Sequence, residues 1–420
     1  MQGLKKVYEI GNIDISAAKG DQALLGDLDG DGRMELLVVQ ADSDIDDRYV
    51  PHQVTCLTAY RLTGKIMWQV GKPLEKSGNR GADYPVQIYD IYGDGELEVL
   101  CILHQQFMVL DGTSGAVKEQ HALPDEEAHD CIIIANLSGG SYASDIILKN
   151  RYHKLWALNR KWELLWTHEG NIGHFPLVYD VNGDGFDEVM AGYDLLDCNG
   201  NILWSCKDLE DHADCLWIGD VNGDGQPEIA VGGSVTCLYS ADGRELWRYD
   251  GSVESQHIAL GKFCPEEPGL QVAGLDRIVR GDGYKGQWDG KDGMFLLDCE
   301  GREVWKEDRK TKGWLTIVDA FYNWNGEDRD YILAYRRGGG VMPGLYNGDM
   351  ENVVTFPQEG YVLHGDLFGR GREDVIIYSN ETAWIYSGTE YDLSQAPSGR
   401  QIEQTRRLWS VTLYPGGVRE

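Results

Sequence analysis

Two nonapeptides, 180–188 (DVNGDGFDE) and 220–228 (DVNGDGQPE), gather carboxylates and glycines at a spacing that suits a cation. Oxygen-bearing side chains stand at the first, third, fifth and ninth positions, and the glycines between them permit a tight turn. A third loop, 27–35 (DLDGDGRME), has the same spacing. Such oxygen ligands bind Ca²⁺, with Mg²⁺ as the alternative ion. The predicted metal ligands are Asp27, Asp29, Asp31, Glu35, Asp180, Asn182, Asp184, Glu188, Asp220, Asn222, Asp224 and Glu228.

Weaker copies of this loop start at positions 90, 136, 323 and 366. Tyr92 replaces one ligand in the copy at 90, and Arg370 places a positive charge where the copy at 366 would need a ligand. An acidic loop repeated along the whole chain is more typical of structural ion sites than of a catalyst. We therefore expect the loops to stabilise the fold and place the chemistry elsewhere.

The repeat also predicts the elements that carry these loops. Successive copies start 63, 46, 44, 40, 103 and 43 residues apart, and the long interval has room for a copy at 261–276 without its acidic loop. Each unit has an apolar stretch, the loop, a β-rich stretch and two short strands joined by a glycine turn. This pattern predicts an all-β protein, a single β-propeller with eight four-stranded blades, or seven as the alternative. Residues 1–420 would form one domain whose ring is closed by N- and C-terminal strands.

The segments that lead into the first strand of each unit lie opposite the acidic loops. Six residues before successive loops stand Asp21, Tyr84, Asp130, His174 and Asp214, with His129, His212 and His257 near equivalent positions. One histidine in a loop means little, but the shared placement of several predicts a functional face. His174, His212 and His257 are the candidate bases, and Tyr84 and His129 are candidate substrate contacts.

Arginines fall in the connections between second and third strands, which lie on this same face. Arg151, Arg277 and Arg336 could bind a carboxylate with their forked guanidinium groups. Tyr152 adds a candidate proton donor, and Trp314 a flat surface for a sugar ring. The combination predicts a pocket for an anionic ligand.

Composition limits the partners of this chain. Its net charge of −31 and the lack of a basic face argue against nucleic-acid binding, and no apolar run is long enough for a membrane span. Nine cysteines in irregular positions and an N-terminus without a leader pattern predict a cytoplasmic protein with reduced thiols, as a monomer or small homo-oligomer.

The loops and segments such as KNRYHKLWALN (149–159) and HADCLWIGDVNGDG (212–225) resemble the calcium-bearing rhamnogalacturonan lyases, over most of the chain. The resemblance implies a lyase that cleaves a rhamnose–uronate linkage in an acidic oligosaccharide or polysaccharide by β-elimination, on imported oligosaccharides. An arginine would neutralise the uronate carboxylate, a histidine would remove the C5 proton, and Tyr152 or a second histidine would protonate the leaving oxygen.

Two other functions stay open. A glycoside hydrolase that releases rhamnose from uronate-containing glycans would need a close pair of carboxylates, for which Asp130 and Asp214 are candidates. A non-catalytic carbohydrate-binding propeller would use the same face without a reaction.

Overall fold

The computed structural model describes residues 4–419 except 44, 47–48, 77–82, 253, 278–291, 308–315, 328, 337–339, 398, 400–401 and 403–415. These residues form 33 strands and no helix, which confirms the predicted all-β class. The described part of the chain consequently offers no long apolar helix that could cross a membrane.

Most of the strands form antiparallel sheets of four. One sheet combines the two ends of the ring: β1 (Tyr8–Asp14), β32 (Thr382–Ser387), β31 (Asp374–Tyr378) and β30 (Tyr361–Gly365). The others follow chain order: β10 (Cys131–Ala135), β11 (Asp145–Lys149), β12 (Lys154–Leu158) and β13 (Leu164–Glu169); β14 (Leu177–Tyr179), β15 (Glu188–Ala191), β16 (Asp194–Leu196) and β17 (Ile202–Ser205); β22 (Ile258–Gly261), β23 (Gln271–Arg277), β24 (Asp292–Leu297) and β25 (Glu303–Lys306); β26 (Thr316–Tyr322), β27 (Asp330–Arg336), β28 (Gly344–Tyr346) and β29 (Asn352–Thr355).

Two sheets are larger. The eight-stranded sheet contains β2 (Gln22–Gly26), β3 (Glu35–Ala41), β4 (Val54–Arg61), β5 (Ile66–Gly71), β6 (Val86–Tyr89), β7 (Glu98–Leu103), β8 (Gln106–Asp111) and β9 (Val117–Ala122). Its halves, β2–β5 and β6–β9, are joined by the parallel pairing of Val54 with Leu103. The five-stranded sheet contains β18 (Cys215–Gly219), β19 (Glu228–Gly232), β20 (Thr236–Ser240), β21 (Glu245–Tyr249) and β33 (Gly417–Arg419).

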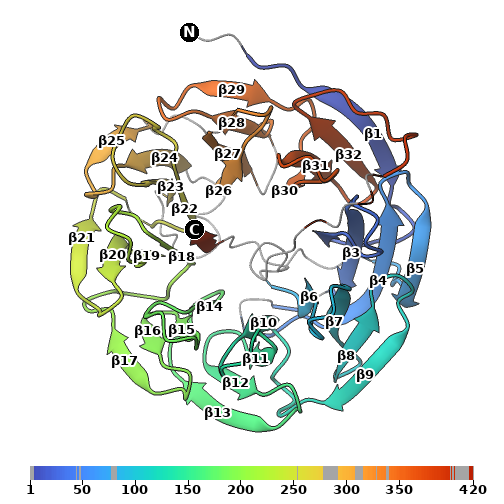
Figure 1. The fold of residues 1–420 in the computed structure, drawn as a ribbon, viewed down its shortest axis with the longest axis horizontal. Helices are drawn as coiled ribbons and strands as arrows, with labels where there is room; N and C mark the ends of the chain where they lie inside the picture. The colour runs from blue at the N-terminus through green and yellow to red at the C-terminus, as the bar shows by residue number, and fades with distance from the viewer. Residues whose placement is uncertain are drawn as a thin grey trace.

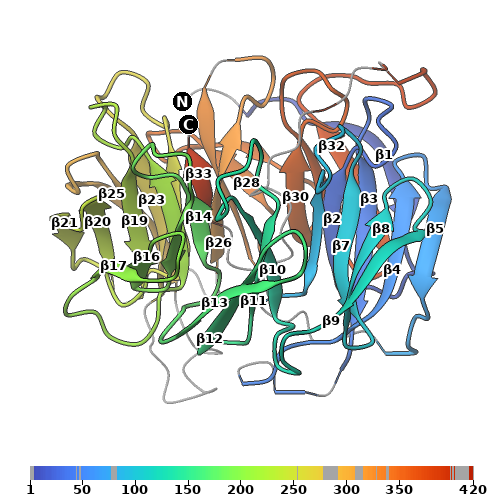
Figure 2. The same cartoon turned by 60° about the horizontal axis from the view of Figure 1, so that its bottom comes forward.

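The sheets are arranged around a common centre, with the first strand of each unit inside and the fourth outside (Figure 1). The burial of the strands follows this order. The inner strands β10 and β18 are buried at every residue, whereas the outer strands β9 and β17 are largely exposed. The turned view shows the loops gathered at two opposite rims (Figure 2). Since each first strand is short, the segment leading into it and the acidic loop after it lie at opposite rims.

The chain ends behave differently from each other. β1 pairs antiparallel with β32 and so completes the last sheet, as expected for the N-terminal strand. The described C-terminal strand does not join that sheet. β33 pairs parallel with β18, aligning Gly417 with Trp217 on the inner edge of another sheet. The C-terminal segment predicted to close the ring lies mostly outside the described residues, and residues 417–419 themselves pair with β18.

Recurring tryptophans join neighbouring sheets at the periphery. Trp204 Nε1 donates to the carbonyl of Ala241 at 2.9 Å, and Trp166 and Trp247 make equivalent bonds to Cys198 and Cys299. The indole also lies against the glycine of the next hairpin turn, so that a Cβ on Gly243 would stand 2.4 Å from the Trp204 ring. The indole and the glycine are thus complementary parts of one contact between sheets.

Substitution of Gly243 by alanine should therefore destabilise the protein. Gly64 provides a matched control, because it holds the same turn position with φ +87°, against +85° for Gly243, and a Cβ on Gly64 would have no other atom within 4 Å. Both variants incur about 1 kcal/mol for positive φ, and Gly243→Ala adds about 1–3 kcal/mol of overpacking. Urea denaturation measures the difference. An equal decrease in the free energy of unfolding of the two variants would contradict the contact between indole and glycine.

A buried histidine connects the last two sheets of the ring. His364 on β30 places Nδ1 2.9 Å from Glu373 and Nε2 3.2 Å from Asp319 on β26. Burial alone would lower the pKa of His364, but the carboxylates of Glu373 and Asp319 outweigh it and raise the pKa to about 10. The imidazole is thus positively charged at neutral pH and holds two carboxylates together.

His364→Gln should destabilise the protein by about 3 kcal/mol near neutral pH, because it leaves the buried Glu373 and the half-buried Asp319 without their cation. A raised pKa in the folded state contributes stability fully below about pH 6.5, and this contribution is lost as pH rises towards 10. The stability difference between variant and parent should therefore shrink between pH 7 and pH 10. A difference that stays constant in urea titrations over this range would disprove the charged state.

Candidate functional site

Two histidines meet where neighbouring sheets lead into their first strands. His174 precedes β14, and His212 precedes β18. The backbone N–H of His174 donates to the carbonyl of Ala213 at 3.0 Å, which fixes one segment against the other. Gly173 has φ +66°, and a Cβ there would stand 2.7 Å from the Ala213 oxygen. Glycine is therefore required for this close approach.

The two imidazoles and a carboxylate form a compact group, which we call the His centre: His174, His212 and Asp214. The Nε2 atoms of His174 and His212 lie 3.1 Å apart. Each of them lies 3.5 Å from the same oxygen of Asp214. The three ligand atoms lie within 4.8 Å of one another, in an arrangement that could hold a metal ion. Imidazole nitrogen and carboxylate oxygen are common ligands of transition metals and zinc.

Carboxylates dominate the electrostatics of this group. Asp211 lies 2.7 Å from His212 Nδ1 on the side away from His174. Burial opposes protonation of His212, but the bond to Asp211 and the charge of Asp214 raise its pKa above the usual value. The His centre therefore attracts positive charge, as a proton or as a cation.

Tyr152 links the His centre to a buried ion-pair network. Its hydroxyl lies 3.5 Å from His174 Nδ1 and accepts a hydrogen bond of 3.1 Å from Arg151 Nη2. Arg151 also donates to Asp130 at 3.0 Å, and Lys149 donates to the other oxygen of that carboxylate. Burial opposes ionisation of Asp130, but Lys149 and Arg151 lower its pKa. This network fixes the guanidinium beside the hydroxyl of Tyr152.

The structure therefore changes the expected role of Arg151. Its side chain is buried and already paired with Asp130, with Asp83 at 3.5 Å from the same guanidinium nitrogen. A guanidinium in this position cannot serve as the exposed clamp for a substrate carboxylate. It donates a hydrogen bond to the hydroxyl of Tyr152 instead.

The other predicted site residues do not join the His centre. His257 is fully buried at the start of β22, which closes its imidazole to a polysaccharide. Tyr84 is buried and donates to Asp21 at 3.5 Å. Arg336 ends β27, which lies across the ring from β14 (Figure 1). Trp314 and the side chain of Arg277 lie outside the described residues.

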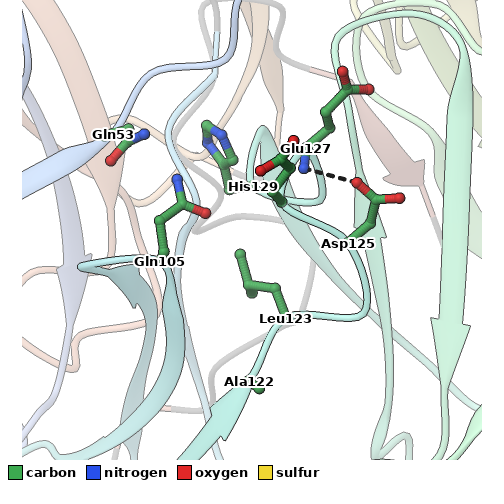
Figure 3. Close-up of a pocket in the computed structure, with 8 residues that line it drawn as sticks. Gln53, Gln105, Ala122, Leu123, Asp125, Glu127 and His129 are labelled. Carbon is green, nitrogen blue, oxygen red and sulfur yellow. Dashed lines mark hydrogen bonds between the residues drawn. The ribbon is translucent and has the colours of Figure 1, made fainter.

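His129 occupies a separate place beside this network. It precedes Asp130 in the chain, is buried, and contributes to the wall of a cavity rather than to the His centre (Figure 3). Its Nδ1 lies 3.2 Å from the carbonyl oxygen of His52.

The acidic loops at 180–188 and 220–228 have a common geometry. The carboxylate of Asp180 accepts hydrogen bonds from the backbone of Gly183 and Gly185, at 2.7 and 2.9 Å. Asn182 donates to Glu188 at 2.8 Å, and burial raises the pKa of Glu188 to about 7. Asp220, Asn222 and Glu228 repeat these bonds. Among the described residues, no lysine or arginine pairs with either set of carboxylates.

The loop at 27–35 differs from this expectation. Asp27, Asp29 and Glu35 bring their oxygens within 4.8 Å of one another, but the guanidinium of Arg61 pairs with Asp29 and lies 3.6 Å from Glu35. Burial, together with the charges of Asp29 and Asp31, raises the pKa of Glu35 to about 9. Arg61 thus supplies positive charge that the sequence pattern assigned to a metal ion, because it reaches the loop from the end of β4.

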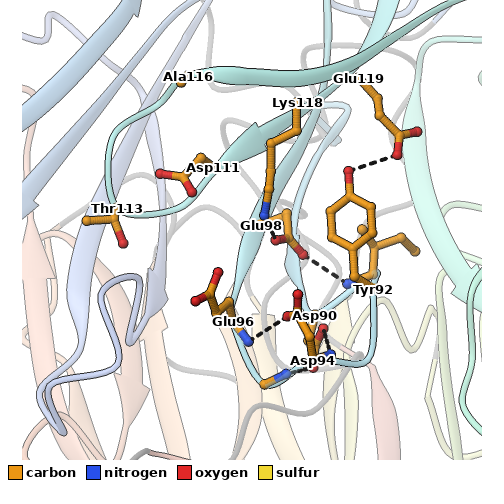
Figure 4. Close-up of polar contacts among 12 residues, drawn as sticks. Asp90, Tyr92, Asp94, Glu96, Glu98, Asp111, Thr113, Ala116, Lys118 and Glu119 are labelled. Atoms are coloured by element: carbon orange, nitrogen blue, oxygen red, sulfur yellow. Dashed lines mark hydrogen bonds and ion pairs between the residues drawn. The ribbon is translucent and has the colours of Figure 1, made fainter.

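In the weakened loop at 90–98, a basic side chain from a neighbouring strand also pairs with a loop carboxylate (Figure 4). Lys118 Nζ donates to Glu98 at 2.7 Å. Tyr92, which replaces a ligand, turns its hydroxyl to Glu119 at 2.8 Å. The bond from Arg160 is the main cause that lowers the pKa of Glu119 to about 2. Lys118 thus neutralises the ninth-position carboxylate from the neighbouring strand.

Sequence reasoning missed that Asp214 meets the two histidines and that Lys149 binds Asp130. The signal for Asp214 was present in HADC (212–215), because residues two apart in an extended segment point to the same side. Lys149 gave no signal, since a lysine at the end of an apolar strand is usually solvated.

Known proteins resemble this chain in sequence. The family described as "Rhamnogalacturonan lyase family 11, C-terminal domain" matches residues 12–122. The rhamnogalacturonan endolyase YesW of Bacillus subtilis (strain 168) is 25% identical over 334 residues, which cover 63% of this chain and 53% of YesW. The rhamnogalacturonan exolyase YesX of the same organism is 29% identical over 451 residues, which cover 86% of this chain and 70% of YesX.

The chain is rhamnogalacturonan lyase-like. It spans about half the length of YesW and 70% of the length of YesX.

Solved structures share the fold of this rhamnogalacturonan lyase-like chain. The crystal structure of YesX has a TM-score of 0.69 at 19% identity and covers 94% of this chain and 77% of its own. A Bacillus licheniformis rhamnogalacturonan lyase has a TM-score of 0.63 at 18% identity, covering 94% and 76%. The V. cholerae biofilm matrix protein Bap1 has a TM-score of 0.64 at 14% identity, covering 97% and 94%. Since both enzymes and a matrix protein share it, the fold alone does not decide the activity.

Removal of the Arg61 side chain should allow the loop at 27–35 to bind a divalent cation. We expect Arg61→Met to lower stability by about 2–4 kcal/mol in chelator, because it leaves buried carboxylates uncompensated. Millimolar Ca²⁺ should then raise the melting temperature of the variant more than that of the parent. Arg244→Met, in an exposed turn, is the control. An equal calcium response in all three proteins would contradict the replacement of a metal by Arg61.

Proposed function

We propose that this protein is a polysaccharide lyase that cleaves a rhamnose–uronate linkage by β-elimination at the His centre. One observation carries the proposal: the facing Nε2 atoms of His174 and His212, together with Asp214, lie beside Tyr152 on the rim opposite the acidic loops. The sequence similarity to rhamnogalacturonan lyases supports the class of substrate.

β-Elimination makes three chemical demands. The uronate carboxylate must be neutralised so that the C5–H becomes acidic, a base must remove that proton, and an acid must protonate O4 as the C4–O4 bond breaks. The electrons of the C5–H bond become the C4–C5 double bond of the product. A site for this reaction therefore needs a positive centre next to a group that exchanges protons.

The donor set of the His centre fits a divalent cation. Two Nε2 atoms 3.1 Å apart, both near one carboxylate oxygen, would compete for a single proton but can share a metal. His174, His212 and Asp214 would hold the ion, and Asp211 would orient His212 through Nδ1. A bound cation would neutralise the uronate carboxylate.

Tyr152 is the residue that we assign to proton transfer. The residue is partly exposed, and its hydroxyl lies against the guanidinium of Arg151, which would stabilise the oxygen after it has lost its proton. The buried pair of Asp130 and Lys149 holds that guanidinium in place. His174, if it holds the cation through Nε2, is no longer available as a base through that atom.

Finer features of the fold belong to the same proposal. We propose that residues 1–420 form one eight-bladed β-propeller, with β2–β5 and β6–β9 as separate blades. The acidic loops at 180–188 and 220–228 would bind structural Ca²⁺, since they lack an internal basic partner among the described residues.

Hydrolysis is less well supported than elimination. It would need Asp130 and Asp214 as a free pair of carboxylates. Asp130 is fully buried and bonded to Lys149 and Arg151, so that it cannot approach a glycosidic bond.

Three variants test the proposed reaction on a rhamnogalacturonan oligosaccharide, with ultraviolet absorbance of the unsaturated product as the readout. Tyr152→Phe should lower kcat by about 10²–10⁴ and keep the affinity for a divalent cation. His212→Ala should lose both activity and cation binding. His153→Ala, at the exposed neighbouring position, should leave both unchanged. Reducing sugar released without an absorbance gain would indicate hydrolysis and refute the proposal.

A further inference from the structure

The segment that carries His212 is held by side chains from neighbouring units. It comprises residues 206–214, between β17 and β18, and contains two aspartates with a left-handed backbone, Asp208 at φ +56° and Asp211 at φ +61°. A left-handed backbone is unfavourable for a residue with a Cβ, so the surrounding structure has to maintain it. The contacts that do so come from residues outside the His centre.

Tyr193 and Arg248 bind the backbone of this segment from two sides. The Tyr193 hydroxyl, in the turn between β15 and β16, donates to the carbonyl of Glu210 at 3.1 Å. Arg248 on β21 donates from Nη2 to the carbonyl of Lys207 at 3.0 Å, and from Nη1 to that of Asp208 at 3.3 Å. β21 lies next to β17 at the periphery of the ring (Figure 1). Two side chains thus fix three carbonyls of one short segment.

We propose that Tyr193 and Arg248 are positioning residues for His212 in the reaction proposed above. The inference rests on the proposed function, because it takes His212 to hold a cation in the His centre. Neither side chain has to touch the cation or the substrate. Tyr193 fixes the backbone immediately before Asp211, whose carboxylate lies 2.7 Å from His212 Nδ1. The direction of the imidazole therefore follows from the path of the segment.

The same segment is also joined to the part of the chain that carries the other histidine. The side chain of Asn171 donates to the carbonyl of Asp211, and the backbone N–H of His174 donates to that of Ala213 at 3.0 Å. A shift of residues 206–214 would therefore change the 3.1 Å separation between the two Nε2 atoms. Because a metal ion needs its ligands at defined distances, such a shift would weaken cation binding.

Arg248 is itself held in one orientation. It donates to the two carboxylate oxygens of Glu245, from Nε at 3.2 Å and from Nη2 at 2.7 Å, and Tyr239 donates to the same carboxylate at 3.0 Å. The bond from Arg248 is the main cause that lowers the pKa of Glu245. Because the guanidinium is planar, a carboxylate bound at two nitrogens fixes the direction of its other N–H groups. Arg248 thus presents a rigid pair of donors to the segment.

The next unit contains an equivalent contact without a link to the His centre. Lys306 on β25 stands one residue after an outer tryptophan, as Arg248 does on β21, and its Nζ donates to the carbonyl of Gly251. Gly251 lies in the connection between β21 and β22, which contributes no residue to the His centre. The position after the tryptophan thus binds the preceding connection in both units. Lys306 is therefore a matched control for Arg248.

A titration of the full chain with Mn²⁺, followed by electron paramagnetic resonance at 25 °C, tests the inference. His212→Ala identifies the part of the binding that belongs to the His centre. Tyr193→Phe and Arg248→Met should each weaken that part about tenfold, as the loss of a supporting hydrogen bond does at metal sites. Arg248→Lys should recover some of the affinity, because Lys306 shows that a lysine at this position reaches a carbonyl of the connection.

Two control variants lose comparable bonds elsewhere and should bind Mn²⁺ as the parent does. Tyr142→Phe removes a hydroxyl that donates to the carbonyl of Tyr92 at 2.8 Å on the opposite rim, and Lys306→Met removes the equivalent of Arg248. A merely structural role would lower the melting temperatures of test and control variants alike and leave the Mn²⁺ affinity unchanged.

The inference and the proposed function can fail separately. If the parent shows no elimination but the two test variants weaken Mn²⁺ binding, the proposed reaction fails and the positioning role stands. The positioning role is overturned if either test variant keeps the Mn²⁺ affinity of the parent, if the controls weaken binding as much, or if His212→Ala binds as much Mn²⁺ as the parent.

Discussion

The buried carboxylate of Asp130 is the charge on which the arrangement beside the His centre depends. It receives Lys149 on one oxygen and Arg151 on the other, inside the ring of sheets. A carboxylate in this environment is stable only with its partners, because without them a buried charge would have neither solvent nor counter-ion. Through Arg151 it holds Tyr152 beside His174.

Repetition and divergence serve different purposes in this fold. The repeated elements hold the fold together: the inner strands are buried along their length, the outer tryptophans pack on turn glycines, and the acidic loops lie at one rim. The opposite rim carries the residues that differ from unit to unit. Even the acidic loops differ in how their charge is balanced, because the side chains of Arg61 and Lys118 pair with carboxylates in two of them. Arg370 does so in the last unit, where it binds Asp374 at 2.7 Å.

The pairing of His174 with His212 changes the chemical meaning of both residues. Apart, each histidine is a candidate general base. With Nε2 atoms 3.1 Å apart and a shared carboxylate, they form a site for one positive charge. The proposed proton transfer then falls to Tyr152, whose hydroxyl accepts a hydrogen bond from Arg151. Burial and pairing with Asp130 likewise argue against the predicted role of Arg151 in binding a substrate carboxylate.

The sequence by itself determined the all-β class, the succession of four-stranded units and the two rims, because these follow from local periodicity and turn chemistry. It also placed His174 and His212 on one face by counting back from the loops, and Tyr152 on the same face as part of a connection between second and third strands. Only the tertiary structure decided which of these side chains meet, that Arg61 occupies a loop predicted to bind metal, and that β33 joins β18. Such outcomes depend on contacts between residues far apart in the chain, and no local pattern records the burial and counter-charges that those contacts create.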